Sequence, residues 1–377
     1  RKSKKLAKLA AEGTRSLSLF QHLPDHEKEK STVADLRAKG GDVDAAVISL
    51  GLQFSKFQIV GGNARCIATL EVFKKLISEY KTPAGTSLQR HLLTIINKQL
   101  DYLSHTRVLA TTMKSAAKHI KSAISNVSID MPDEDAKAQL KTVIDEFIRD
   151  RITLADQMIV EQAQEIDKIK DGDLIMVFGR SSVVLDLLVA THEDFQAAGK
   201  KFQVVVVDSR PKCEGRKMIR ELTTHGIECT YVFLNALSMI MPKVDKVILG
   251  ASAVMSNGAI LGRAGTAMVA LAAHERKVPV IVCAETYKFT DVVRLDAFVW
   301  NELGDPNELA SKSHAKSTLN SDTLANPLSG WKDIATLHLL NLHYDITPAD
   351  FLTMVICEHA VFPPTSVGTV MRDRTEK

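Results

Sequence analysis

Residues 246–283, KVILGASAVMSNGAILGRAGTAMVALAAHERKVPVIVC, contain the alternation that decides the fold class of this chain. Apolar runs at 246–250 and 278–283 predict two strands, and a glycine-punctuated loop between them leads into an Ala-rich helix at 262–275. The runs are continuous, which is typical of strands buried on both faces of a parallel sheet. Strand, helix and strand in this order predict a doubly wound α/β domain, in which ligands bind at the carboxyl ends of the strands.

The same alternation extends over the C-terminal half. Further strands are predicted at residues 174–178, 202–208, 229–233 and 297–300. Helices are predicted at residues 182–197, 214–225 and 348–358, the last with Thr347 as its N-cap and Pro348 at its first helical position. We therefore expect a Rossmann-like domain over residues 171–377.

The N-terminal half has a different, helical period. From residue 42 to 170 apolar residues recur three and four positions apart, as in Ile67, Leu70 and Phe73. This pattern predicts a helical domain that ends in a long connecting helix from about residue 133 to 169. Residues 1–41 are polar and rich in turn formers, so they are predicted to be a tail and linker that packs only locally.

Composition excludes several classes of protein. The net charge of +3 is close to balance, and the five cysteines form no CxxC pair, so neither a nucleic-acid partner, a disulfide framework nor a metal site is expected. No apolar stretch reaches the roughly 18 residues of a membrane helix, which predicts a cytosolic protein without a membrane contact. The sequence begins at an arginine within the basic run RKSKKLAK, and we expect a longer natural N-terminus.

Several strand ends carry groups capable of chemistry. The segment after the first strand, Gly179 to Ser182, offers backbone N–H groups that suit an anion, although it lacks the GxGxxG pattern and is equally a plain strand-to-helix turn. Asp208, Ser209 and Arg210 lie at the carboxyl end of the second strand, and Arg210 could hold either a phosphate or a carboxylate of the chain itself. Cys213 next to Glu214 is interpreted as structural, because adjacent residues on a helix point apart.

Long blocks of this sequence are similar to a known family. VVVVDSRPKCEG, DAFVWNEL and NLHYDITPADFLTMVICEHAVFPPTSV resemble the C-terminal domain shared by the regulatory subunits of eukaryotic translation initiation factor 2B and their relatives, the sugar-phosphate isomerases. The resemblance covers about residues 17–372. SLFQHLP, LGLQFSKFQIVGGNARCIA and HTRVLATTMKSAAKHI resemble the delta branch more than the alpha or beta branch.

The resemblance implies that the catalytic groups of the isomerases are missing. Those enzymes use a cysteine after the first strand and an aspartate after the fourth, and the matching positions are Gly179 and Ser252. Neither can exchange protons near neutral pH, so no catalytic residue and no cofactor is expected. What remains is a vestigial ligand pocket, expected to include Arg180, Asp208, Ser209, Arg210, Asn257 and Arg263.

The resemblance further implies a non-catalytic regulatory subunit of the guanine-nucleotide exchange factor for initiation factor 2. The implied partners are beta-, alpha-, gamma- and epsilon-type subunits and initiation factor 2, especially its phosphorylated alpha subunit. The candidate contact residues are Arg65, Arg107, the basic stripe of Lys114, Lys118 and Lys121, and the apolar pair of Leu50 and Phe54. A solvated stripe and a buried pair are the simpler alternatives, and an isomerase with a rearranged acid/base pair or a sugar-phosphate or nucleotide sensor is the alternative function.

Overall fold

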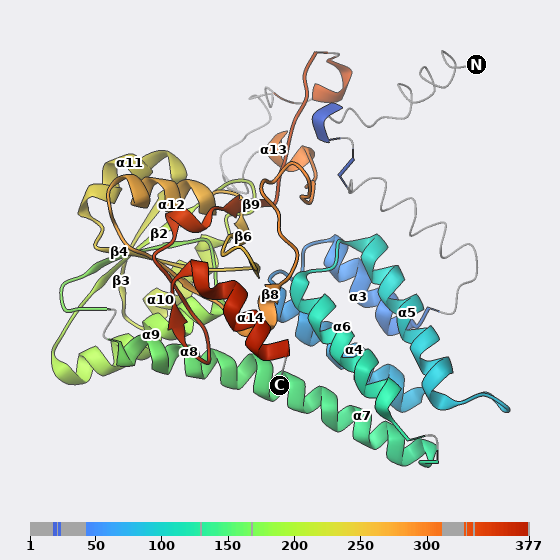
Figure 1. Ribbon diagram of the computed structural model, residues 1–377. Helices are drawn as coiled ribbons and strands as arrows, with labels where there is room; N and C mark the ends of the chain where they lie inside the picture. Colours follow the sequence, from blue (N-terminus) through green and yellow to red (C-terminus); the bar gives the residue numbers. More distant parts are fainter. Residues whose placement is uncertain are drawn as a thin grey trace.

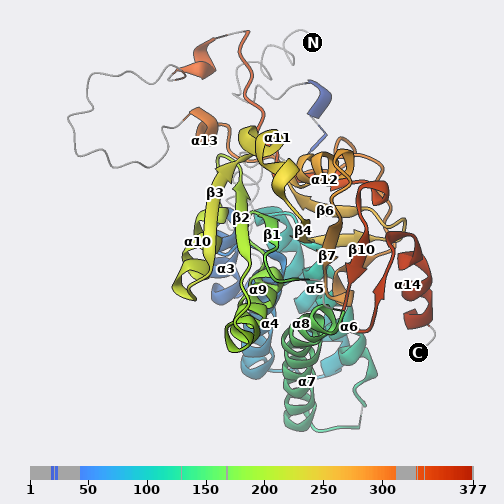
Figure 2. The same cartoon turned by 90° about the vertical axis from the view of Figure 1, so that its left-hand side faces the viewer.

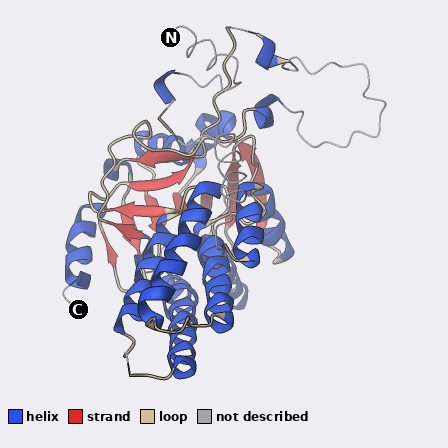
Figure 3. Cartoon of the chain, turned by 90° about the vertical axis from the view of Figure 1, so that its right-hand side faces the viewer, coloured by secondary structure: helices blue, strands red, loops and turns tan. Residues whose placement is uncertain are grey.

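The computed structural model describes residues 18–20, 22–23, 43–128, 130–166, 169–310, 328, 330–334 and 336–375. A bundle of helices lies beside a twisted sheet that is covered by helices on both faces (Figure 1). The helices of the bundle and the strands of the sheet occupy different parts of the molecule (Figure 3), and the bundle comes first along the chain. The predicted class, a helical domain followed by a Rossmann-like domain, is confirmed. The basic run at residues 1–8 lies outside the described residues.

Within the described part of the chain five helices make the bundle, and one apolar core holds them together. They are α3 (Ala45–Ser55), α4 (Gly62–Glu79), α5 (Leu88–Thr106), α6 (Thr111–Asn126) and α7 (Asp133–Ile148). Their apolar stripes, three and four residues apart, point inward and bury side chains such as Phe73 and Ile96. Tyr287 of the sheet domain enters the same core, so the two domains share a packed boundary.

The predicted connecting helix is present and carries one irregular turn. It consists of α7, the π-helical turn η2 (Arg149–Thr153) and α8 (Leu154–Glu165), which form a continuous rod along the base of Figure 1. Single π-turns inside α-helices are frequent at functional sites. The rod is the direct covalent connection between the bundle and the sheet domain.

The main sheet has the strand order β11-β10-β7-β4-β1-β2-β3, with every neighbouring pair parallel except β10 and β11 (Figure 2). The strands are β1 (Leu174–Phe178), β2 (Gln203–Asp208), β3 (Glu228–Phe233), β4 (Lys246–Gly250), β7 (Val280–Cys283), β10 (Met354–Ile356) and β11 (Val361–Phe362). The order reverses between β1 and β4, which is the switch point where doubly wound folds bind ligands.

Helices cover both faces of this sheet, as the continuous apolar runs require. On one face α8, α9 (Ser182–Ala198) and α10 (Gly215–Thr224) pack on alternate strand residues such as Ile175 and Val177. On the other face α11 (Leu237–Ile240), α12 (Thr266–Glu275) and α14 (Val367–Thr375) contact the side that includes Met176. No helix among the described residues is long and apolar enough to cross a bilayer.

A second, smaller sheet is present that the sequence pattern did not predict. Its order is β8-β5-β6-β9, with β5 (Ala253–Met255), β6 (Ile260–Arg263), β8 (Phe289–Thr290) and β9 (Tyr344–Thr347). The predicted helix at 262–275 therefore begins only at Thr266, after Gly265 turns the chain with a φ of 115°. The loop after β4 is in fact a hairpin, whose short strands gave no separate apolar period.

Two predicted elements are wrong. Residues 297–300 form no strand, because the Asp296 carboxylate accepts hydrogen bonds from the N–H groups of Phe298 and Val299 and bends the chain. Residues 348–358 form no long helix: Thr347 ends β9, a single turn η7 (Ala349–Phe351) follows, and β10 then pairs with β7. Pairing with a central strand overrides the local helical pattern there.

The N-terminal segment makes a long-range contact that was not expected. The ring of Phe20 in η1 (Ser18–Phe20) stacks on that of Phe298 at 5.5 Å, and the His22 ring bonds the Phe298 carbonyl. We call η1 together with residues 291–300 the arm; η1 lies at the top of Figure 1, in the same region as α13 (Asn307–Ala310). The prediction that this segment packs only locally is therefore wrong for residues 18–20 and 22–23.

Candidate functional site

A cavity of about 1360 Å³ opens at the switch point, between the carboxyl ends of β1 and β4 and the helical bundle. Ser181, Ser252 and Arg263 line it from the sheet domain, and Asn63 and Arg65 line it from the start of α4. Close approach of the strand ends is possible because Gly250 has no Cβ, which would overlap the Ser181 side chain. The position is that of a ligand site in this fold class.

The two positions that the resemblance matches to the acid/base groups of the isomerases are occupied by Ser252 and Gly179. Ser252 lines the cavity, and its N–H donates to the Leu261 carbonyl. Gly179, with a φ of 61°, lies instead on a neighbouring recess of about 40 Å³. Cys213 also reaches the cavity, but burial, followed by the charge of Asp208, raises the pKa of its thiol. A neutral thiol is a weak nucleophile.

Four of the cations that line the cavity are each paired with a carboxylate of the chain itself. Arg263 holds Glu214 through hydrogen bonds of 3.0 and 2.8 Å, and Arg180 holds Glu221 at 2.8 and 3.0 Å. Lys212 contacts Glu308 at 2.6 Å, and Lys288 contacts Glu285 at 2.5 Å. A phosphate entering the cavity would have to compete with these carboxylates for its counter-charges.

The remaining pocket candidates have structural contacts. Asp208 is buried and accepts a hydrogen bond of 2.8 Å from the Tyr231 hydroxyl, while Ser209 donates to the Ala264 carbonyl. The guanidinium of Arg210 lies over the Phe233 ring at 5.7 Å. These three residues line the smaller recess. Asn257 is exposed in the β5–β6 turn, where its Oδ1 accepts from the Ala259 N–H, so it does not join the others.

A cluster at the domain boundary gave no signal in the sequence. Glu285 is fully buried, accepts a hydrogen bond of 2.5 Å from Asn63 and pairs with Lys288. Burial alone would raise the pKa of Glu285, but Lys288 and the hydrogen bonds outweigh it and keep that pKa below the usual range. On α8, burial and the nearby Glu285 raise the pKa of Asp156 to about 9. Its carboxyl is thus protonated at neutral pH.

The apolar and arginine candidates for partner contacts are interior residues. Leu50 and Phe54 belong to the bundle core. The guanidinium of Arg65 donates to the Val108 carbonyl at 2.7 Å and lies 5.0 Å from the Phe54 ring centroid. Arg107 is 2% exposed and pairs with Glu302 at 2.5 Å. In this chain these four side chains do not form a solvent-facing surface.

The basic stripe lies on the outer side of the bundle. Lys114 and Lys118 on α6 are exposed, and Lys121 is partly exposed. Burial, followed by the charge of Arg294, lowers the pKa of Lys114, so Arg294 extends this positive surface towards the arm. No group of acidic, histidine and cysteine side chains that could hold a metal ion occurs in the part of the chain that the structure describes.

Comparison with known proteins places these features in a family. A profile of the initiation factor 2 subunit family matches residues 58–364. The chain is 44% identical to a translation initiation factor eIF2B subunit delta from Schizosaccharomyces pombe, over 95% of this chain and 74% of that one. It is 37% identical to the Dictyostelium discoideum subunit delta, with 98% of this chain but 58% of that protein covered.

An enzyme and a solved structure complete the comparison. A ribose 1,5-bisphosphate isomerase from Pyrococcus furiosus is 27% identical over 89% of this chain and 95% of its own length. A chain in the crystal structure of the tetrameric eIF2B-beta2-delta2 complex from C. thermophilum is 29% identical, with a TM-score of 0.74 over 93% of this chain and 99% of that chain. The similarity therefore extends over both domains.

Proposed function

Because this chain belongs to the initiation factor 2 subunit family, in its eIF2B delta branch, we propose that it is a non-catalytic regulatory subunit of the exchange factor for initiation factor 2. In this role it assembles with beta-, alpha-, gamma- and epsilon-type subunits in the cytosol. It also helps to recognise the phosphorylated alpha subunit of initiation factor 2. The delta chain of the related tetramer is named together with a beta chain, which supports the first of these partners.

The observation that carries the non-catalytic assignment is the state of the cavity. It has the volume and position of a substrate site, yet Ser252 lines it where the related isomerases carry an acid, and Gly179 lies outside it. The cations Arg263 and Lys212 are held by carboxylates of the same chain. An aldose-to-ketose shift needs groups that release and return protons near pH 7, each worth about 10² to 10⁴ in rate.

Exposed apolar side chains support an assembly role. On the arm Leu295 is 86% and Val299 69% exposed, and on the sheet domain Met239 is 78% and Met268 55% exposed. Large apolar side chains exposed to this extent are candidates for contacts between proteins when they are close to one another on a surface. We assign them to contacts with other subunits.

The stripe of Lys114, Lys118 and Lys121 supports recognition of a phosphorylated partner. The three ammonium groups lie on one face of α6, and none of them forms an ion pair with an acidic side chain among the residues that the structure describes. A phosphoserine carries about −1.5 to −2 charges at pH 7 and gains most from such a surface. This assignment separates the stripe from the internally neutralised cations of the cavity.

Co-expression with a beta-type subunit tests the assembly. A stable complex that survives gel filtration in 0.5 M salt is expected, and a chain that elutes alone would contradict the proposal. Within the full complex, Lys118→Glu is expected to reduce the preference for the phosphorylated over the unphosphorylated alpha subunit about tenfold, by removing one attractive charge and adding a repulsive one. Lys243→Glu, an exposed lysine in η4 (Met241–Lys243) of the sheet domain, is the matched control.

A sugar-phosphate isomerase or sensor is the second candidate, favoured by the protonated Asp156 beside Lys288 on the cavity wall. Incubation of the purified chain with ribose 1,5-bisphosphate decides the enzymatic form. No turnover above background is expected, and turnover would replace the first proposal. Calorimetry with the same compound decides the sensor form, for which heat at millimolar ligand is required.

A further inference from the structure

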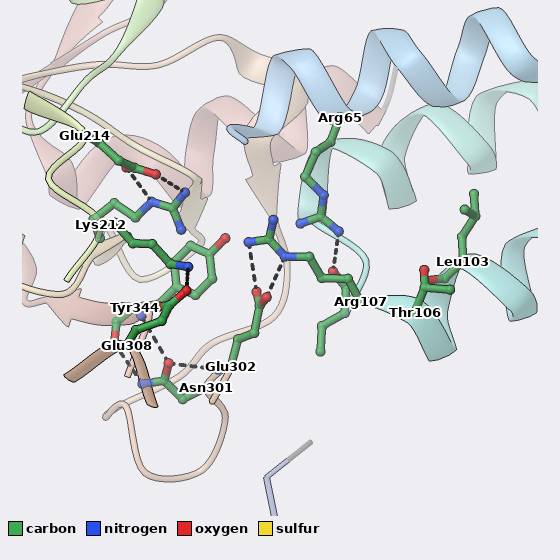
Figure 4. A network of polar contacts seen from close by, with 12 residues as sticks. Arg65, Leu103, Thr106, Arg107, Lys212, Glu214, Asn301, Glu302, Glu308 and Tyr344 are labelled. Carbon is green, nitrogen blue, oxygen red and sulfur yellow. Dashed lines mark hydrogen bonds and ion pairs between the residues drawn. The ribbon is translucent and has the colours of Figure 1, made fainter. Parts of the chain in front are cut away.

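The two domains meet at a group of five side chains, which we call the interdomain joint: Phe57, Arg107, Lys212, Glu302 and Glu308. Phe57 lies in the turn between α3 and α4 and Arg107 directly after α5, so both belong to the bundle. Lys212 lies between β2 and α10 in the sheet domain. The two glutamates belong to the segment 301–310, and Figure 4 shows Glu302 pointing towards Arg107 and Glu308 towards Lys212.

The Phe57 ring is held between two cations from different domains. The Arg107 guanidinium carbon lies 4.0 Å from the ring centroid, and the Lys212 ammonium lies 3.8 Å from it. Both cations approach the ring closely enough for a cation–π attraction, which is strongest where water is excluded. The two domains therefore touch through an aromatic side chain that binds one cation of each.

One carboxylate neutralises each of these cations. Glu302 pairs with Arg107 through contacts of 2.5 and 3.4 Å, and Glu308 pairs with Lys212 at 2.6 Å. Both carboxylates come from the same short segment, so a movement of either domain changes the position of the other domain's counter-ion. The His343 ring, 4.7 Å from that of Phe57, closes the joint, and burial lowers the pKa of His343 to about 3, which keeps it neutral.

The backbone at Phe57 is in an unfavourable conformation. Its φ of 53° is in the left-handed region, which bulky residues rarely adopt. Such conformations persist where the surroundings over-determine them, and they gather at switch regions. The contacts of the ring with Arg107 and Lys212 offset the free-energy cost of this backbone conformation. Because Lys212 belongs to the sheet domain, the conformation of the α3–α4 turn depends on that domain.

We propose that the interdomain joint sets the orientation of the helical bundle against the sheet domain and passes binding events on α6 to the subunit contacts of the sheet domain. The rod of α7, η2 and α8 connects the domains covalently but contains a π-turn, and the joint fixes the other side of the boundary. The claim that the joint transmits binding on α6, here called the binding part, rests on the proposed function. The claim that the joint sets the orientation of the two domains, here called the mechanical part, does not.

Hydrogen exchange in the assembled complex tests the mechanical part. Phe57→Leu keeps an apolar side chain but removes the ring, and it is expected to speed exchange of the Gly304 and His343 amides about tenfold. The Gly304 N–H donates to the backbone carbonyl of Asn341 at 2.8 Å, and the His343 N–H donates to that of Glu302 at 3.1 Å. Exchange of these two amides therefore reports on the 301–310 segment. Exchange of these amides at the wild-type rate in Phe57→Leu would overturn the proposal that the Phe57 ring holds the two domains in place.

Two further variants keep that result specific. Phe57→Trp retains an aromatic ring and is expected to exchange within a factor of two of wild type, whereas fast exchange in this variant would mean that the site senses only side-chain shape. Phe195→Leu removes another ring that meets a lysine, Lys200 at 5.5 Å, at the end of α9. It is expected to leave the Gly304 and His343 amides unchanged, and acceleration there would overturn the local role of Phe57.

The binding part is tested by the ratio of dissociation constants for the unphosphorylated and phosphorylated alpha subunit of initiation factor 2. Phe57→Leu is expected to bring that ratio at least threefold closer to one, although Phe57 lies on neither α6 nor the arm. An unchanged ratio would overturn the coupling. A wild-type complex that fails to discriminate would instead remove the proposed function, and the exchange result would still decide the mechanical part.

Discussion

The guanidinium of Arg263 and the carboxylate of Glu214 lie side by side on the cavity wall, joined by hydrogen bonds of 3.0 and 2.8 Å. The pair connects the end of β6 with the N-terminal end of α10, and each side chain remains about one-fifth exposed. Arg263 also lies over the Tyr344 ring at 5.1 Å. The chain thus keeps a cation, Arg263, at the position of a ligand site, and its own Glu214 takes the place of an anionic ligand.

Replacing Glu214 with Gln should show how much the Arg263–Glu214 pair contributes to stability. The change leaves Arg263 without its counter-ion, and we expect a loss of about 2 kcal/mol of unfolding free energy, less than for a fully buried pair because water reaches both groups. Phosphate at 20 mM should then restore part of the melting temperature of Glu214→Gln, since an anion can replace the carboxylate. Differential scanning fluorimetry measures both effects.

The matched control is Glu221→Gln, which removes the partner of Arg180 from the more exposed pair on the same cavity wall. It should cost under about 1 kcal/mol and show a smaller phosphate response. If phosphate raises the melting temperature of wild type as much as that of Glu214→Gln, Glu214 does not block an anion site.

The Arg107–Glu302 pair should show strong coupling in a double-mutant cycle. Both side chains are buried, so Arg107→Met or Glu302→Leu alone leaves an uncompensated charge and should cost about 3 to 5 kcal/mol. The double variant should cost clearly less than the sum, because no charge is left behind. Urea denaturation of the purified chain gives the four free energies.

An exposed pair provides the comparison for that cycle. Arg149 and Asp150 are joined at 2.7 Å on the surface, and breaking them should cost under about 0.5 kcal/mol. Additive effects of the Arg107 and Glu302 changes would show that the two side chains do not stabilise the domain boundary together.

Most strands of the main sheet could be predicted because each of them is a short continuous apolar run in the sequence. Residues 174–178 and 246–250 are short apolar runs, and the structure confirms both as β1 and β4 at the same bounds. The strand β10 could not be predicted, since its three residues follow a helix-like start and become a strand only by pairing with β7. Secondary structure fixed by tertiary pairing leaves no local pattern to read.

The candidate site was predictable in position but not in its connections. The carboxyl ends of β1 and β4 identify the cavity from the strand order alone. The partners of its charged groups could not be predicted, because Glu214 and Glu308 lie 49 and 96 residues along the chain from Arg263 and Lys212, the cations they bind. Asp156 was missed for the same reason: only the fold places it near Glu285.

A pair of glycines separates backbone strain from steric overlap. Gly258 has a φ of 81°, and a Cβ there would overlap the Pro364 carbonyl oxygen, whereas Gly85 has a φ of 80° with nothing within 4 Å of that position. Gly85→Ala should therefore cost only about 1 kcal/mol, and Gly258→Ala several times more. Equal losses of unfolding free energy would contradict the close packing of the β5–β6 turn against the 364–366 turn.

The protonated state of Asp156 predicts an unusual pH dependence. Its pKa is raised from 3.8 to about 9 in the folded chain, so between these values the folded state holds a proton that the unfolded state has released. Stability contributed by this group is therefore complete below about pH 4 and declines as the pH rises towards 9. Asp156→Asn has no proton to lose and should melt with a smaller fall between pH 6 and pH 9 than wild type. Glu161→Gln, an exposed residue on the same helix, should follow wild type, and parallel curves for wild type and Asp156→Asn would show that Asp156 is ionised at neutral pH.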